Sequence, residues 1–224
     1  MIIYLTGIDG SGKTALITQI EEHLAELNID SERIWARYSP KLARFLVRGF
    51  KKRTISHDGD YNKISASEYN EWQMRKKKLS GNKIVKFTLL TLFSIDYLFQ
   101  ILPVLRKIRA IDKHTVIIDR FVIDFIADQT VNFGDLSDTL IYKKFIRICN
   151  QFDAVFFISV RPEVALSRKN DIPGLTYLKE RDKVYRDIIK ELGSGYIIDN
   201  NGPFNNAIKT ILKILNVDGH DNRD

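Results

Sequence analysis

Residues 7–14 carry the pattern G-x-x-x-x-G-K-T, which places a lysine and a hydroxyl directly after a glycine-rich loop. Glycine lets the backbone wrap closely around a phosphate, the lysine reaches the β- and γ-phosphates, and the hydroxyl ligates Mg²⁺. This spacing predicts a phosphate-binding loop (P-loop) for a nucleoside triphosphate. The expected contacts are Gly7, Asp9, Gly10, Ser11, Gly12, Lys13 and Thr14.

The residues on either side of this loop have the composition that its mechanism requires. An apolar run at residues 2–6 precedes it, and a helical pattern at residues 15–26 follows it. A helix that begins at the loop contributes oriented N–H groups and a partial positive charge to the phosphate site. The loop is therefore expected between a buried strand and a helix N-terminus.

Strand-like and helix-like segments alternate along the chain. Alternation of this kind predicts an α/β fold, a parallel sheet covered on both faces, with ligands beyond the carboxyl ends of the strands. We expect strands at residues 2–6, 33–37, 115–119, 154–160 and 196–199. We expect helices at residues 15–26, 89–108, 138–151, 162–169, 178–192 and 205–215.

Length and composition fit one such domain over residues 1–217, followed by a flexible tail at 218–224. The chain has 224 residues, of which 44% are hydrophobic. Its single cysteine, Cys149, excludes an internal disulfide and a cysteine-based zinc site, and we expect it buried in a helix. No charged-then-apolar leader precedes the first strand, so we expect a cytoplasmic protein.

The positive charge is concentrated between Lys41 and Lys86, where there are 13 Lys or Arg and 4 Asp or Glu. This excess of 9 positive charges is larger than the net charge of the whole chain, which is +7. Such a segment could attract phosphorylated ligands, nucleic acid or an anionic membrane, or form a solvated helical face. Few aromatic residues interleave its basic runs, which disfavours a nucleic-acid interface. We interpret residues 41–85 as a basic helical insertion near the acceptor site, with helices at 42–50 and 67–78 and a loop at 54–63.

Residues 87–105 form a run of nineteen without Lys or Arg, long enough to cross a membrane. The run contains Asp96, Gln100 and Pro103 and lies within an α/β pattern. We therefore expect a helix buried in the core, and no membrane partner.

A second motif, Asp119-Arg120-Phe121, ends the third expected strand. A carboxylate in this place beside a P-loop usually assists Mg²⁺, directly or through water, and the arginine offers a forked donor to phosphate. Alternatively, the two residues form an ion pair that caps the strand. Asp124 and Asp128 follow, four residues apart on one helical face, where they could receive hydroxyls or a cation, or form a polar helix edge.

Together these segments resemble the thymidylate kinases, a family of P-loop nucleoside-monophosphate kinases. The similarity lies in Gly7-Ile8-Asp9-Gly10, in Asp119-Arg120-Phe121 with Gln129 after it, and in the segments 93–97, 161–168 and 177–185. It covers most of the chain except about residues 41–85. The resemblance implies a P-loop kinase fold with a five-stranded parallel sheet in the order 2-3-1-4-5, helices on both faces, and a lid at about residues 168–177.

The resemblance also implies roles for individual residues. Lys13 would hold the ATP phosphates, Arg120 would grip the acceptor phosphate, and Arg168 would reach from the lid to the transferring phosphoryl group. Asp9 would lie near the acceptor's sugar or the metal. Mg²⁺ would be bound with the help of Thr14 and Asp119. The implied reaction is phosphoryl transfer from ATP to a nucleoside monophosphate, most simply dTMP to dTDP for nucleotide biosynthesis, in a homodimer.

The chain departs from the family where the acceptor would be recognised. Arg37 stands in an altered segment after the second strand, Tyr97 replaces an arginine, and Asp124 and Asp128 replace a serine and a tyrosine. Changed polar groups predict a changed acceptor, so two alternatives stay open: a related kinase for another small molecule, and a nucleotide-dependent nucleic-acid-binding module. The candidate acceptor-binding residues are Asp9, Arg37, Tyr97, Arg120, Asp124, Asp128 and Gln129.

Overall fold

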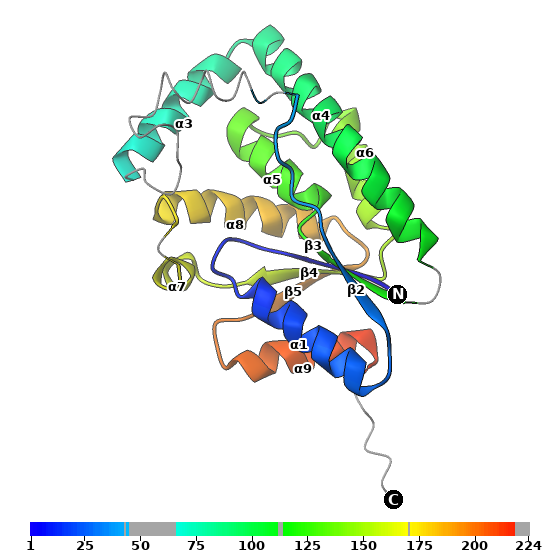
Figure 1. Ribbon diagram of the computed structural model, residues 1–224. Helices are drawn as coiled ribbons and strands as arrows, with labels where there is room; N and C mark the ends of the chain where they lie inside the picture. The colour runs from blue at the N-terminus through cyan, green and yellow to red at the C-terminus, as the bar shows by residue number, and fades with distance from the viewer. Residues whose placement is uncertain (43, 45–65, 112–113, 170, 218–224) are drawn as a thin grey trace, which may run out of the picture.

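A five-stranded parallel sheet forms the centre of the molecule, with helices on both faces (Figure 1). The computed structural model describes residues 1–42, 44, 66–111, 114–169 and 171–217. The strand order is β2-β3-β1-β4-β5, as predicted. The strands are β1 (Ile2–Thr6), β2 (Ser31–Trp35), β3 (Thr115–Asp119), β4 (Ala154–Ser159) and β5 (Gly195–Asp199).

The three central strands are apolar along their length because both of their faces are covered. β3 and β4 are buried at every residue and β1 at all but its first, as expected for a parallel sheet between two helical layers. The edge strands β2 and β5 are each buried at one residue only. All four strand pairings are parallel, so the carboxyl ends of the strands lie along one edge of the sheet.

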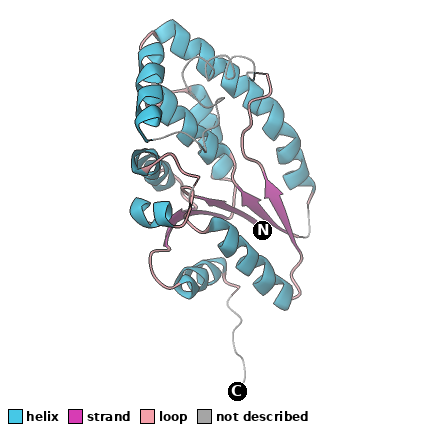
Figure 2. Ribbon diagram, turned by 60° about the vertical axis from the view of Figure 1, so that its left-hand side comes forward, coloured by secondary structure: helices cyan, strands magenta, loops and turns pink. Residues whose placement is uncertain are grey.

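Two helical layers cover the sheet. Helices α1 (Lys13–Glu26) and α9 (Phe204–Leu215) pack on one face, and four further helices lie on the opposite side (Figures 1 and 2). These are α4 (Lys83–Ala110), α5 (Val122–Phe133), α6 (Leu140–Cys149) and α8 (Leu175–Lys190). The short helix α7 (Pro162–Ser167) follows β4, and α3 (Ala66–Ser80) lies beyond α5. Cys149 ends α6 fully buried, as expected.

Most expected elements are present, with shifted ends. β2 lies two residues earlier than expected, at Ser31–Trp35, where it pairs with β3 in register from Thr115 to Asp119. The expected helix at 67–78 is α3. The expected helix at 42–50, the loop at 54–63 and the tail at 218–224 fall largely or wholly outside the described residues.

The expectation that the run at residues 87–105 is a helix buried in the core is wrong for the exposed face of α4. The helix is longer and is capped at its start by Asn82, whose side chain accepts from Ile84 N and Val85 N. Only 28% of its most apolar stretch is buried. By length and composition it meets the criteria for a membrane-spanning helix, a test that core helices of soluble proteins also pass. Its exposed apolar side chains are Ile84, Phe87, Ile95, Phe99 and Leu102.

Replacing Phe156 by alanine tests how far the sheet depends on the layer of α1 and α9. Phe156 is fully buried at the centre of β4 on that face. We expect a loss of about 3–5 kcal/mol in the free energy of unfolding, from lost burial and the remaining cavity. Chemical denaturation measures it. The control is Ile197→Ala on β5, where the side chain is 43% exposed, and we expect less than about 1 kcal/mol. Equal losses in the two variants would contradict this account of the core.

Candidate active site

The glycine-rich loop is held between β4 and α7. It leaves β1 at Thr6 and enters α1 at Lys13. Gly7 and Gly10 have φ values of 150° and 80°, which other residues rarely adopt. A Cβ atom on Gly10 would lie 2.4 Å from the carbonyl oxygen of Ala165 in α7. Loop and helix therefore pack backbone against backbone, and this position requires glycine.

Lys13 is folded back onto its own loop. Its Nζ donates to the carbonyl oxygens of Gly7 and Ile8 at 2.8 and 2.7 Å, and to Ser11 Oγ at 3.1 Å. Burial, with a smaller contribution from the charge of Arg120, lowers the pKa of Lys13 to about 7. The amine is thus partly neutral near physiological pH, and it charges fully when an anion lies beside it.

Arg168 lies at the C-terminal end of α7, where the segment predicted to be a lid begins. Its Nη2 donates to the carbonyl oxygen of Asn200 at 3.3 Å, and the Asn200 side chain donates to Ser11 O at 2.8 Å. Asn200 therefore links Arg168 to the P-loop. The arginine is exposed, so its guanidinium has room to turn toward a phosphate.

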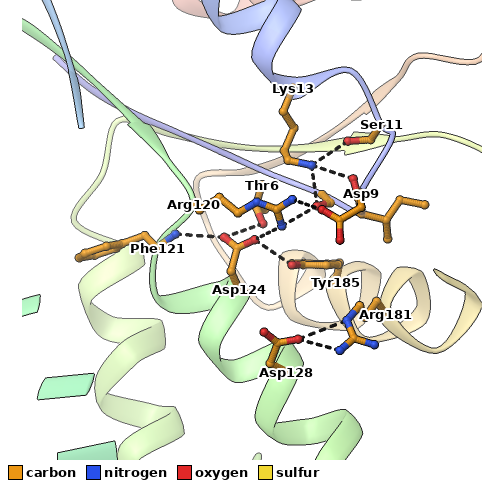
Figure 3. Close-up of polar contacts among 12 residues, drawn as sticks. Thr6, Asp9, Ser11, Lys13, Arg120, Phe121, Asp124, Asp128, Arg181 and Tyr185 are labelled. Carbon is orange, nitrogen blue, oxygen red and sulfur yellow. Dashed lines mark hydrogen bonds and ion pairs between the residues drawn. The ribbon is translucent and has the colours of Figure 1, made fainter. Parts of the chain in front are cut away.

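Arg120 connects the P-loop to the helix after β3. Its backbone is in the left-handed region, with φ 66°, a costly conformation for a residue with a side chain. Its guanidinium bonds to Asp9 Oδ1 at 2.6 Å, to Asp124 Oδ1 at 2.9 Å and to the carbonyl oxygen of Gly7 at 3.3 Å. The left-handed turn thus aims a largely buried cation at the phosphate loop (Figure 3).

Asp9 is the loop's contribution to this network. Its second oxygen accepts from Tyr177 Oη at 3.0 Å. Burial alone would raise the pKa of Asp9, but the charges of Arg120, Lys13 and Arg37 hold it well below its usual range. Asp9 is therefore an anion over the whole physiological range, and a weak base.

Asp124 is the most heavily bonded carboxylate in the described part of the site. Burial opposes its ionisation, but the neighbouring Arg120 and several hydrogen bonds lower its pKa. Both oxygens are occupied by donors from the protein itself, so the visible role of Asp124 is to orient these groups. The donors are Tyr4 Oη, Thr6 Oγ1, Arg120, Phe121 N and Tyr185 Oη, at 2.7, 3.2, 2.9, 3.0 and 2.8 Å.

These groups border a small pocket beyond the carboxyl ends of the strands. Its wall opposite the P-loop is made by α5 and α8, which lie side by side (Figure 3). Three carboxylates and three guanidinium groups line it. The lining residues are Ile8, Asp9, Arg37, Arg120, Asp124, Asp128, Tyr177, Arg181 and Tyr185.

The two residues predicted to assist a metal lie near the P-loop. Thr14 is exposed in the first turn of α1. Asp119 ends β3 and forms an ion pair with Arg33 of β2, with 2.5 Å between Nη2 and Oδ2. A hydroxyl and a carboxylate suit Mg²⁺, which usually takes its remaining ligands from water and substrate phosphates. Among the described residues, no group of three or more His, Cys, Asp or Glu could hold a metal by itself.

Two other predicted residues lie outside the pocket lining. Tyr97 is buried in α4, with its ring stacked on Phe125 at 4.4 Å between centroids. Gln129 is buried in α5. A role for either in binding an acceptor remains a prediction, as do the other site assignments.

Sequence reasoning missed the contribution of α8. Tyr177, Arg181 and Tyr185 all line the pocket, and none was singled out as a site residue. Their spacing of four residues puts them on one face of the helix, a signal that was available. Their partners, Asp9, Asp128 and Asp124, lie more than fifty residues away in sequence, which the spacing could not reveal.

Comparison with known proteins establishes the fold. No protein-family model matches the chain, and no curated protein sequence matches it. Among solved structures, the chain is similar to deoxyadenosine kinase from M. mycoides with bound dATP, at 18% identity and a TM-score of 0.56, over 96% of this chain and 99% of that chain. A structure of the same enzyme with dCMP and a flexible dCDP bound aligns at 17% identity and a TM-score of 0.47, with the same coverage. The first likeness and the strand order confirm the P-loop kinase fold.

The pKa of Lys13 predicts a pH-dependent affinity for nucleotide. Phosphate oxygens beside Lys13 favour its charged form, so binding takes up a proton wherever the free protein holds the amine neutral, which is above about pH 7. From about pH 7.5 to 9 the phosphates themselves are fully ionised. Over this range we expect the affinity for Mg-ATP to fall by up to about tenfold per pH unit, as measured by calorimetric titration.

The control is Lys13→Arg, because a guanidinium keeps its charge at these pH values. Its affinity for Mg-ATP should be independent of pH over the same range, whatever its absolute value. A wild-type affinity that is equally flat would show that Lys13 is fully charged in the free protein.

Proposed function

We propose that this protein transfers the γ-phosphoryl group of ATP to a small acceptor that itself carries a phosphate, with a nucleoside monophosphate as the first candidate. The observation that supports this most directly is the pocket beside the P-loop, which is lined by Arg37, Arg120 and Arg181. Guanidinium groups are suited to phosphate, which they bind with paired hydrogen bonds. In this proposal Arg37 and Arg120 hold the acceptor phosphate.

The state of the carboxylates favours a phosphorylated acceptor over a hydroxyl acceptor. A phosphate oxygen is ionised at neutral pH and can attack without help, whereas a hydroxyl benefits from a general base. Asp9 and Asp124 are poor bases, since their pKa values are lowered and their oxygens already accept hydrogen bonds. The similarity of the sequence motifs to thymidylate kinases makes dTMP the first acceptor to test.

A second candidate is a kinase for a nucleoside. The structural neighbour with a TM-score of 0.56 is named a deoxyadenosine kinase. In addition, Asp128 has one carboxylate oxygen to which no described residue donates, and this oxygen could accept from a hydroxyl. A broad acceptor panel separates the two candidates.

The donor half of the proposed reaction rests on positioning and charge. Lys13 and the loop N–H groups would hold the ATP phosphates, and Arg168 would stabilise charge on the transferring group. Thr14 and Asp119 would help to hold Mg²⁺, which bridges phosphate oxygens and offsets their charge. The ion pair between Asp119 and Arg33 keeps this carboxylate fixed at the end of β3.

We also propose that the protein is a cytoplasmic homodimer that uses the exposed apolar face of α4. This face carries the exposed side chains of Phe87, Ile95, Phe99 and Leu102, and a large exposed apolar patch can mark a contact with another protein. Phe99→Glu would place a charge within this face. We expect the variant to be monomeric in light scattering after size exclusion, with the wild type at twice its mass. A wild-type monomer would contradict the proposed dimer.

The proposed reaction predicts ADP release from Mg-ATP that depends on a nucleoside monophosphate. Lys13→Ala and Arg120→Ala should each lower kcat/KM by at least about a hundredfold, because Lys13 would hold the ATP phosphates and Arg120 the acceptor phosphate. A coupled assay of ADP release measures this. Arg147→Ala is the control, since Arg147 is exposed on α6, and its rate should equal that of the wild type.

The same panel identifies the class of acceptor. Turnover with monophosphates but not with nucleosides would support the proposal. Turnover with nucleosides alone would favour the second candidate. No turnover with either, in a protein that binds Mg-ATP, would overturn both and direct the search to other small molecules.

A further inference from the structure

The wall made by α5 and α8 contains two polar contacts, one helical turn apart. The first joins Asp124 to Tyr185 and Arg120, beside the P-loop. The second joins Asp128 to Arg181, farther from the loop (Figure 3). One turn of helix is about 5.4 Å. The second contact therefore faces the part of an acceptor that is remote from the reacting phosphate.

The second contact leaves half of a carboxylate available. Arg181 Nε and Nη2 both bond to Asp128 Oδ1, at 3.2 and 2.8 Å. No described residue donates to Asp128 Oδ2, and the Asp128 side chain is 37% exposed whereas that of Arg181 is 11% exposed. Since both residues line the pocket, the second oxygen can bond to a molecule that enters it.

Arg181 is fixed by three contacts besides its ion pair. Its guanidinium lies 3.8 Å above the centre of the Tyr177 ring. It also donates to Tyr69 Oη of α3 at 3.3 Å and to the carbonyl oxygen of Tyr177 at 3.4 Å. An arginine held by these contacts restricts the orientation of the Asp128 carboxylate, and so the position of its second oxygen, before any ligand binds.

We propose that Asp128, positioned by Arg181, determines which acceptors the protein binds. This inference rests on the proposed function. The pair selects acceptors that present a hydrogen-bond donor, a hydroxyl or an amino group, at the end of the pocket remote from the P-loop. A carboxylate only accepts hydrogen bonds, so it repels a carbonyl oxygen placed in the same position. Polar groups that a wrong ligand leaves unpaired discriminate far more strongly than pocket shape does.

The test compares pairs of acceptors that differ in one group. CMP and dCMP differ in a sugar hydroxyl, and dAMP and 2′-deoxynebularine monophosphate differ only in the amino group of the base. For wild type, Asp128→Asn and Asp182→Asn, both kcat/KM in ADP release and the dissociation constant from calorimetry are measured with each acceptor. Asp182 is the matched control, because it also pairs with an arginine of α8, Arg186, and does not line the pocket.

We expect the wild type to prefer the donor-bearing member of at least one pair by about tenfold or more, through a charge-assisted hydrogen bond. Asp128→Asn should reduce this preference to near one, and Asp182→Asn should leave it unchanged. Arg181→Lys keeps the charge but loses the fork, so it should weaken the same preference while the protein remains folded by circular dichroism. It also serves as the second variant if Asp128→Asn does not fold. The pair of acceptors that responds identifies the donor as a hydroxyl or an amino group.

The inference would be overturned if Asp128→Asn and Arg181→Lys both kept the wild-type preference for the donor-bearing acceptor, in kcat/KM and in the dissociation constant. If no monophosphate supports turnover, the proposed function fails, and calorimetry then decides the inference separately. If the wild type binds the donor-bearing acceptor more tightly and Asp128→Asn does not, the inference holds for a protein with a different reaction. If the wild type binds both members of each pair equally, the inference is overturned.

Discussion

Arg120 is the cation around which the candidate site is built. It joins the P-loop, through Asp9, to α5, through Asp124, and it does so from a left-handed backbone turn directly after β3. Removing a charge from water is costly, and a buried pair offsets that cost only when its remaining hydrogen-bonding groups are also satisfied. Here the two carboxylates accept further bonds from Tyr177, Tyr185, Tyr4 and the backbone of Phe121. Losing one member of such a network strands a buried charge, at a cost of about 3–5 kcal/mol.

This network explains why the phosphate site can be rigid although it is made of a loop. Asp9 accepts a hydrogen bond from Arg120, Gly10 lies against the backbone of Ala165, and the Asn200 side chain donates to the carbonyl oxygen of Ser11. The loop therefore has its shape before nucleotide binds, which reduces the ordering cost of binding. The contact with Ala165 also means that α7 and the P-loop cannot move independently at this point.

Much of the fold follows from the sequence because its signals are local. The central strands were predictable at Ile2–Thr6 and Thr115–Asp119, where apolar runs end at the two motifs. The P-loop was predictable from spacing alone. β2 was placed two residues too late because its edge position leaves only Ile34 buried, which weakens the apolar signal. The outer face of α4 could not be predicted, since apolar composition does not distinguish a core from an exposed surface.

The site was less predictable because its contacts are between distant segments. Asp124 was predicted to be an acceptor-binding residue. Its hydrogen-bond partners include Tyr4, which is 120 residues away in sequence, and sequence spacing cannot reveal such a contact. Arg181 was missed because its role depends on Asp128 and on Tyr69 of α3.

The Asp124 carboxylate is shared by β1, by the turn before α5 and by α8, and this has a consequence for the dynamics of the protein. No one of these elements can separate from the others without exposing a buried charge or leaving it unpaired. Local opening should therefore involve all three at once, as a single cooperative unit whose amide hydrogens exchange together. The pocket wall is therefore expected to be among the last parts of the molecule to open.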